Sequence, residues 1–185
     1  MSNSILVKYN LNNMKRIILN FLIPALLILM IPALGFSQDC SLKNDKDADN
    51  QPRLSTGFLS FGVGTSYFLL SMDAGKKDID LFFVIKGSGP ECFDEESTVT
   101  INFDDGKTKM TLKNTGATNC NRILHVTFRN GPVTHTYLQR LSTRKVASFH
   151  IVGTDKTADI HLSEQDKILL MNRASCVAVE SKKIL

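Results

Sequence analysis

Residues 98–112 constrain the fold more than any other stretch, because apolar and polar side chains alternate there around a turn dipeptide. The apolar members of the alternation are Val99, Ile101, Phe103, Met110 and Leu112. A period of two places such side chains on one face of a strand. Asp105-Gly106 lies between the two halves and supplies the positive φ values of a tight hairpin turn. The segment therefore predicts an antiparallel hairpin with one buried face.

The rest of the chain continues this rhythm. Three short apolar segments separated by turn residues predict further strands, at 58–63, 67–72 and 81–86. Residues 124–128 alternate as well, and Asn130-Gly131 after them predicts a second hairpin whose return strand covers residues 133–138. These segments together predict a mainly β fold, either an antiparallel β-sandwich or a curled sheet of hairpins.

A third hairpin is expected around Asp155-Lys156. This centre pairs Phe149 with Leu162 and Ile151 with Ile160, so that apolar side chains meet on one face. The agreement of the two strands in polarity supports this register.

The opposite face of the third hairpin then receives His150 directly opposite His161. Two imidazoles at paired positions can share a metal ion, and Asp159 is the nearest outward carboxylate. His150 and His161 are therefore the candidate metal ligands. The alternative, which is commoner in proteins, is a pair of exposed strand residues that needs no cofactor.

Residues 163–178 predict a C-terminal helix that covers the sheet. Ser163 and Asp166 have the spacing of a capping box, in which each side chain binds the backbone N–H of the other residue. The helical apolar stripe consists of Leu170, Met171, Ala174, Val177 and Ala178. A hairpin of strands 168–171 and 176–179 stays an alternative, because short apolar runs do not separate helix from strand. One helical turn is expected at 139–144.

Residues 1–37 have the pattern of a secretory signal peptide. Lys15-Arg16 precede the apolar run 17–34, and Gly35-Phe36-Ser37 end the segment with small residues at its first and last positions. We expect cleavage near Ser37-Gln38 and a periplasmic or secreted mature protein.

An uncleaved membrane anchor is the alternative to cleavage, because the apolar run approaches the length that spans a bilayer. The run is interrupted by Asn20, Pro24 and Pro32. After cleavage we expect no stable membrane insertion, and no lipid on Cys40, since Asp39 stands where a lipobox needs a small residue. Met14 directly precedes the basic pair, so residues 1–13 are an extension or a misassigned start.

The signal peptide also carries most of the excess positive charge. Its removal takes away Lys8, Lys15 and Arg16 and no acidic residue, which lowers the formal net charge from +4 to about +1. The remaining basic residues are interleaved with acidic ones, whereas nucleic-acid binding needs a clustered basic face. We therefore expect no nucleic-acid partner.

All four cysteines, Cys40, Cys92, Cys120 and Cys176, follow the predicted cleavage point. An even number without a CxxC spacing, in an oxidising compartment, predicts two structural disulfides. Three connectivities are open. We favour Cys40 with Cys92 and Cys120 with Cys176.

The mature chain is expected to form one domain. Residues 38–53 predict a flexible polar arm, since 43–50 contain almost no apolar side chain. Residues 54–185 then form a single β-rich domain.

Common catalytic motifs such as GxSxG, HExxH and the Walker A loop do not occur in the sequence. His125, His135, His150 and His161 all fall within predicted strands, where a structural role is expected. An acidic cluster beside Cys92, formed by Glu91, Asp94, Glu95 and Glu96, has the residue types for glycoside hydrolysis, but a solvated loop is the simpler interpretation. We assign no catalytic residue and no cofactor.

Two features carry a resemblance. The ending Gly35-Phe36-Ser37-Gln38 of the leader resembles export signals of Bacteroidota-type bacteria. Residues 98–178, through Asn119-Cys120 to Ser175-Cys176, resemble small secreted or periplasmic proteins of those bacteria that have no assigned activity. The resemblance implies a compartment and a β-rich fold, and it assigns no site residues.

The sequence therefore predicts an exported, non-catalytic binding or accessory protein of the bacterial cell envelope, whose partner is an envelope protein or ligand. One alternative is an envelope hydrolase whose site assembles from distant loops. Another is a metal-binding sensor or carrier that uses His150 and His161.

Overall fold

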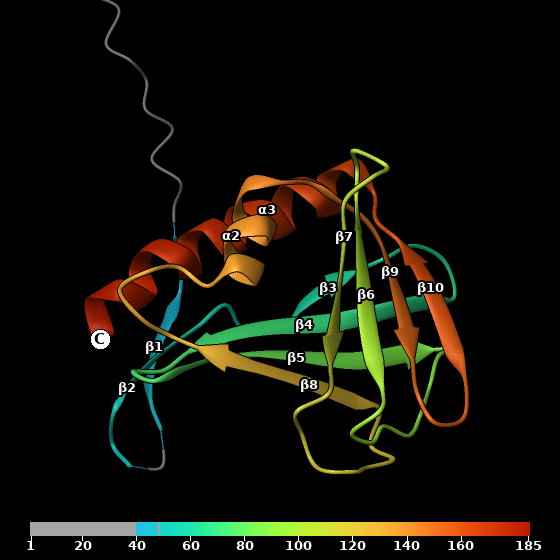
Figure 1. Ribbon diagram of the computed structural model, residues 1–185, viewed down its shortest axis with the longest axis horizontal. Helices are drawn as coiled ribbons and strands as arrows, with labels where there is room; N and C mark the ends of the chain where they lie inside the picture. The colour runs from blue at the N-terminus through green and yellow to red at the C-terminus, as the bar shows by residue number, and fades with distance from the viewer. Residues whose placement is uncertain (1–39, 48) are drawn as a thin grey trace, which may run out of the picture. The chain divides into compact units, whose positions relative to one another are not determined.

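The computed structural model describes residues 40–47 and 49–185 (Figure 1). The strands are β1 (Lys43–Lys46), β2 (Pro52–Ser55), β3 (Leu59–Phe61), β4 (Ser66–Ala74), β5 (Asp78–Gly87), β6 (Thr98–Phe103), β7 (Lys109–Lys113), β8 (Ile123–Arg129), β9 (Val146–Val152) and β10 (Thr157–His161). The helices are α2 (Thr136–Thr143), α3 (Glu164–Glu180) and the 3-10 helix η1 (Ser181–Ile184). The predicted signal peptide and its cleavage point lie outside the described residues. Within those residues, no helix is long and apolar enough to cross a membrane.

Two antiparallel sheets form the fold, which confirms the predicted mainly β class. One sheet has six strands in the order β1-β2-β4-β5-β8, with β3 paired to β4 beside β2. The other has four strands in the order β10-β9-β6-β7. Figure 1 shows that the strands of the two sheets cross at a steep angle, and that α2 and α3 cover the side left open between them.

The core lies between the two sheets and the helices. Four phenylalanine rings from both sheets meet there, namely Phe61, Phe68, Phe83 and Phe149. The rings of Phe68 and Phe149 join the sheets edge to face, with centroids 4.8 Å apart. Such aromatic contacts add to the burial of apolar surface, which is the main force that holds the sheets together.

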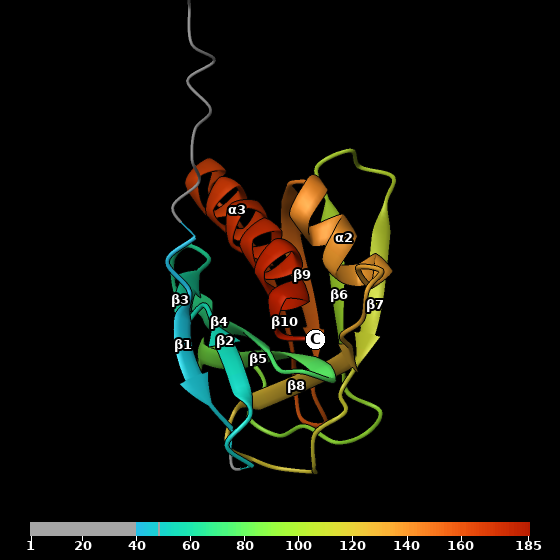
Figure 2. The ribbon, with the colours of Figure 1, turned by 90° about the vertical axis from the view of Figure 1, so that its left-hand side faces the viewer.

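The C-terminal helix confirms the helical interpretation of residues 168–179. Ser163 accepts the backbone N–H of Asp166 and the Asp166 side chain accepts the N–H of Ser163, so the predicted capping box is present. α3 buries Leu170, Ala174 and Val177 against the core. α2 packs on α3 (Figure 2).

The predicted return strand over residues 133–138 is wrong, because α2 begins at Thr136. The His135 side chain caps this helix by accepting the N–H of Tyr137. Leu138 and Leu141 lie three residues apart and are both buried, because a helix places them on the same face. The predicted helical turn at 139–144 is therefore part of a longer helix.

The predicted polar arm is also corrected. β1 and β2 form a hairpin in place of a free arm, and β2 continues the sheet by pairing with β4. All four residues of β1 are exposed, which is why their composition has no core signal. Charged side chains on such an edge strand discourage pairing with other chains.

The register of the β9–β10 hairpin differs from the predicted one by two residues. Asp159 lies opposite His150, and His161 lies opposite Ser148. The turn is shifted because the Asp155 carboxylate accepts the backbone N–H groups of Glu91 and Cys92, each at 3.2 Å. A shift of two leaves every side chain on its predicted face.

The four cysteines form two disulfides, as predicted, but the favoured pairing is wrong. Cys40 pairs with Cys176, and Cys92 pairs with Cys120. The loops that carry Cys92 and Cys120 lie side by side because Phe93 and Asn119 exchange backbone hydrogen bonds. The Cys40–Cys176 bond fastens the start of the described chain to α3.

Candidate functional site

The six-stranded sheet has one face on the core and one face that points away from it, called the outer face here. Three rows of side chains cross β4, β5 and β8 on this outer face. The aliphatic row is Leu69, Val84 and Ile123; the middle row is Ser71, Phe82 and His125; the ionic row is Asp73, Asp80 and Thr127. Tyr67 lies beyond the aliphatic row on β4 and is 37% exposed. The outer face thus changes from apolar to polar within a few residues along each strand, and the carboxylates lie on β4 and β5.

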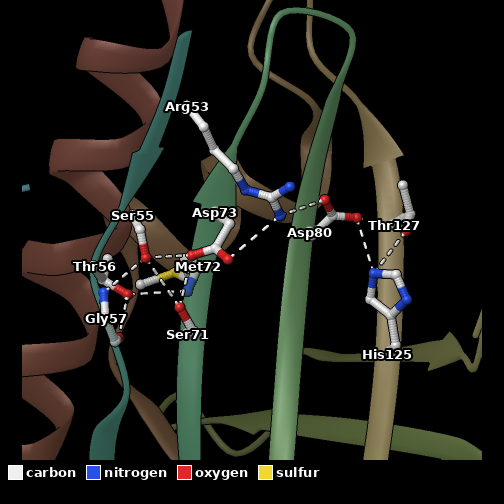
Figure 3. Close-up of polar contacts among 10 residues, drawn as sticks. All are labelled: Arg53, Ser55, Thr56, Gly57, Ser71, Met72, Asp73, Asp80, His125 and Thr127. Atoms are coloured by element: carbon white, nitrogen blue, oxygen red, sulfur yellow. Dashed lines mark hydrogen bonds and ion pairs between the residues drawn. The ribbon is translucent and has the colours of Figure 1, made fainter. Parts of the chain in front are cut away.

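Arg53 on β2 bridges the two carboxylates of the ionic row (Figure 3). Its Nη2 donates to Asp80 Oδ2 at 3.1 Å and to Asp73 Oδ2 at 3.4 Å. Asp73 and Asp80 are direct cross-strand partners, so the two negative charges would repel each other without a cation between them. Arg53 therefore fixes the edge strand β2 to the centre of the sheet.

The other oxygen of Asp80 faces β8. Asp80 Oδ1 accepts a hydrogen bond from Thr127 Oγ1 at 2.8 Å and lies 2.9 Å from His125 Nε2. Thr127 Oγ1 and His125 Nε2 are themselves 3.0 Å apart. We call Arg53, Asp73, Asp80, His125 and Thr127 the polar network.

The position of His125 is fixed from three sides. Its ring stacks on Phe82 with centroids 4.3 Å apart and an interplanar angle of 10°. Its backbone N–H donates to Asn114 Oδ1, and its carbonyl accepts the N–H of Thr115. Residues 114 and 115 thereby cover the edge of β8 and hold the imidazole over the sheet.

The network keeps Asp80 ionised. Partial burial alone would raise the pKa of the Asp80 carboxyl. Hydrogen bonds from His125 and Thr127, together with the charges of His125 and Arg53, outweigh burial and hold that pKa below its usual value. Asp80 is therefore a stable anion at neutral pH.

A hollow of about 510 Å³ opens beside the charged end of the outer face. It lies between the β1–β2 turn and the β4–β5 turn, and we call it the turn hollow. Its lining consists of Asp47, Asp49, Gln51, Arg53, Gly75, Lys76, Lys77, Asp78 and Asp80. Arg53 and Asp80 thus belong both to the polar network and to this hollow.

The predicted metal ligands are not paired with each other. His150 Nδ1 lies 2.7 Å from Asp159 Oδ1, its cross-strand partner, and His161 lies diagonally across from His150. Nowhere in the part of the chain that the structure describes do three or more His, Cys, Asp or Glu side chains form a group suited to a metal ion. The metal site at His150 and His161 thus stays a prediction. The direct cross-strand pairing of the two histidines, on which the prediction was based, is absent between these two residues.

The acidic cluster beside Cys92 is spread over separate structural contacts. Glu91 pairs with Arg122, and Asp94 accepts the backbone N–H groups of Glu96 and Ser97. Glu96 pairs with Lys113 at 3.0 Å, and Glu95 is exposed. The contacts fit the solvated loop that the sequence predicts.

No protein-family model matches the chain, and no curated protein or solved structure is significantly similar to it.

The polar network was not predicted from the sequence. The contacts of Asp73 and Asp80 with Arg53, His125 and Thr127 join residues 20 to 47 positions apart along the chain, which hides their proximity. A signal does exist in β5, where Asp78 and Asp80 alternate with Ile79 and Leu81. Extension of the predicted strand 81–86 to include them would have placed two carboxylates on an otherwise apolar outer face.

Proposed function

We propose that the protein is an exported, non-catalytic binding or accessory protein of the bacterial cell envelope, and that the outer face of the six-stranded sheet is its binding surface. The observation that carries the proposal is the polar network beside the half-buried aliphatic row. Ionised groups that are partly withdrawn from water and held by ion pairs form a rigid pattern of charge that a partner can read. The two disulfides fit an oxidising extracellular environment.

The geometry favours binding over hydrolysis. In a nucleophilic triad the carboxylate and the hydroxyl occupy opposite nitrogens of the histidine. Here Asp80 and Thr127 both meet Nε2 of His125, so Thr127 has no separate base. A glycosidase needs one carboxyl whose pKa is raised, whereas the pKa of Asp80 is lowered.

Sedimentation with envelope material tests the proposal. The purified exported protein is mixed with membranes and cell wall from its own cells and centrifuged. We expect it to sediment with them, and we expect Val84→Lys and Ile123→Lys, which put a charge in the aliphatic row, to stay in solution. Thr111→Lys is the matched control on the four-stranded sheet and should sediment like the wild type, with melting curves confirming that all variants fold. A soluble wild type, or equal loss with Thr111→Lys, would contradict the proposal.

A further inference from the structure

The turn hollow contains charges of both signs that the protein itself does not pair. Lys76 and Lys77 line it and have no carboxylate partner among the described residues. The side chains of Asp49 and Asp78 likewise have no basic partner among these residues. Other lysines of the described chain do form ion pairs, such as Lys113 with Glu96 and Lys167 with Asp104. The turn hollow thus brings two unpaired lysines and two unpaired aspartates together around one cavity.

The two remaining carboxylates of the lining are already engaged. Asp47 Oδ1 accepts the backbone N–H groups of Asp49 and Gln51 and so closes the β1–β2 turn. Asp80 belongs to the polar network. These two side chains shape the hollow, while Asp49 and Asp78 stay available to a ligand.

Arg53 presents an unused edge to the hollow. Of the three guanidinium nitrogens of Arg53, only Nη2 carries dashed lines in Figure 3, because it alone donates to Asp73 and Asp80. Nη1 and Nε have no hydrogen-bond partner within the described residues, although a guanidinium has five N–H donors. The two carboxylates behind Arg53 hold the guanidinium in place, so a ligand would bind it at little further cost in side-chain entropy.

We propose that the turn hollow binds a small zwitterionic ligand, a free amino acid or a short peptide with free termini, whose carboxylate is held by the free edge of Arg53. Lys76 and Lys77 support the same carboxylate, and Asp49 and Asp78 receive the ammonium group. The volume of about 510 Å³ lies in the range of small-ligand sites. This ligand class rests on the binding function proposed above and deepens it.

Other ligand classes fit the lining less well. A phosphate group would meet four aspartates around the same hollow, which repel a multiply charged anion. A neutral ligand would leave the lysines and aspartates without partners. A ligand with one charge of each sign satisfies both sets.

Calorimetry on the purified exported protein with triglycine tests the proposal. The comparison ligands are glycine, N-acetyl-triglycine, triglycine amide and inorganic phosphate. We expect triglycine or glycine to bind, and we expect blocking either terminus of triglycine to weaken binding about tenfold or more, because each block removes a charge-assisted hydrogen bond. The ligand class is a short peptide if triglycine binds more tightly than glycine, and a free amino acid if glycine binds more tightly.

Variants locate the site. Arg53→Lys keeps a cation for Asp73 and Asp80 but loses the free guanidinium edge, and it should weaken triglycine binding about tenfold. Lys76→Gln with Lys77→Gln should weaken it as well. Lys107→Gln with Lys109→Gln is the matched control, because these lysines have no carboxylate partner in the described chain; Lys107 lies in the β6–β7 turn and Lys109 begins β7. This double variant should bind like the wild type.

Three results would overturn the proposal: no binding of either triglycine or glycine, tighter binding of phosphate than of both, or a blocked peptide that binds as tightly as triglycine. Sedimentation with the envelope separates the two proposals. If neither triglycine nor glycine binds but Val84→Lys still abolishes sedimentation, the ligand class is wrong and the binding surface stands. If the wild-type protein also stays in solution in the sedimentation experiment, both proposals are wrong.

Discussion

Each of the two outer sheet faces carries one histidine–aspartate pair, and the two pairs are built differently. On the six-stranded sheet the His125 and Asp80 side chains are 25% and 17% exposed. On the four-stranded sheet the His150 and Asp159 side chains are 40% and 67% exposed. Arg53 and Thr127 also bind Asp80, whereas Asp159 has no other side-chain partner among the described residues.

The comparison separates an ordinary surface from a specialised one. An exposed pair such as His150–Asp159 contributes at most about 1 kcal/mol, because water competes for both charges. Partly buried charges lose hydration and are stable only when every partner is in place. The outer face of the six-stranded sheet therefore depends on its network in a way that the other face does not, and this dependence is open to measurement.

The largest difference is expected on removal of a cation from each face. Arg53→Ala leaves Asp73 and Asp80 opposed without a counter-charge and should lower the free energy of unfolding by about 2 kcal/mol, a figure already reduced for partial exposure. Lys113→Ala, which removes the partner of the exposed Glu96, should change it by less than about 0.5 kcal/mol. Urea unfolding of both variants measures the two values. Equal losses of unfolding free energy in the two variants would show that the two outer faces do not differ in their dependence on ion pairs.

The next largest difference concerns the two aspartates. Asp80→Asn weakens the bonds to Arg53, His125 and Thr127 and should cost about 1.5 kcal/mol. Asp159→Asn weakens a single exposed pair and should cost less than about 0.5 kcal/mol. Thermal and urea unfolding near pH 7 provide the comparison, and a larger loss for Asp159→Asn would reverse it.

Low pH should reduce the contribution of the Asp80 carboxylate to the free energy of unfolding. Because the pKa of Asp80 is lower in the folded protein than in the unfolded chain, the unfolded chain takes up the proton first as the pH falls. The stabilisation is complete above the unfolded value of about 3.9 and is lost as the pH falls through the folded value. The difference in unfolding free energy between wild type and Asp80→Asn should shrink as the pH falls below about 4. A difference that grows below that pH would contradict the assigned ionisation.

The smallest effect is expected at the threonines. Thr127→Val removes a donor to Asp80 and should cost about 1 kcal/mol. Thr111→Val removes the hydroxyl contact with Thr100 on the exposed face and should be nearly neutral, since valine suits a strand. Urea midpoints at constant slope measure both changes, and similar values for the two would show that Thr127 adds nothing to the network.

The sequence predicts those parts of the fold whose causes are local. The hairpin at 98–112 follows from alternation around Asp105-Gly106, and α3 follows from its capping box. The strand predicted at 133–138 failed because the β-branched residues Val133, Thr134 and Thr136 favour a strand locally, while burial of Leu138 and Leu141 imposes a helix.

Features with distant causes were not predictable. The β9–β10 turn is positioned by Asp155, whose partners Glu91 and Cys92 lie more than sixty residues away. The disulfide pairing and the polar network have the same origin, because Arg53, Asp80 and His125 become neighbours only when three strands align. The alternation of polar and apolar residues assigns each of these side chains to one face of its strand. It does not predict which residues of other strands lie next to it on that face.

The Cys40–Cys176 bond has a mechanical consequence. The two cysteines are 136 positions apart in the sequence, and their covalent link makes the chain between them a closed loop. Tension applied between Cys40 and α3 would pass through one sulfur–sulfur bond and would bypass both sheets. A load of this kind would leave the β1–β2 hairpin, Arg53 and the outer face unstrained.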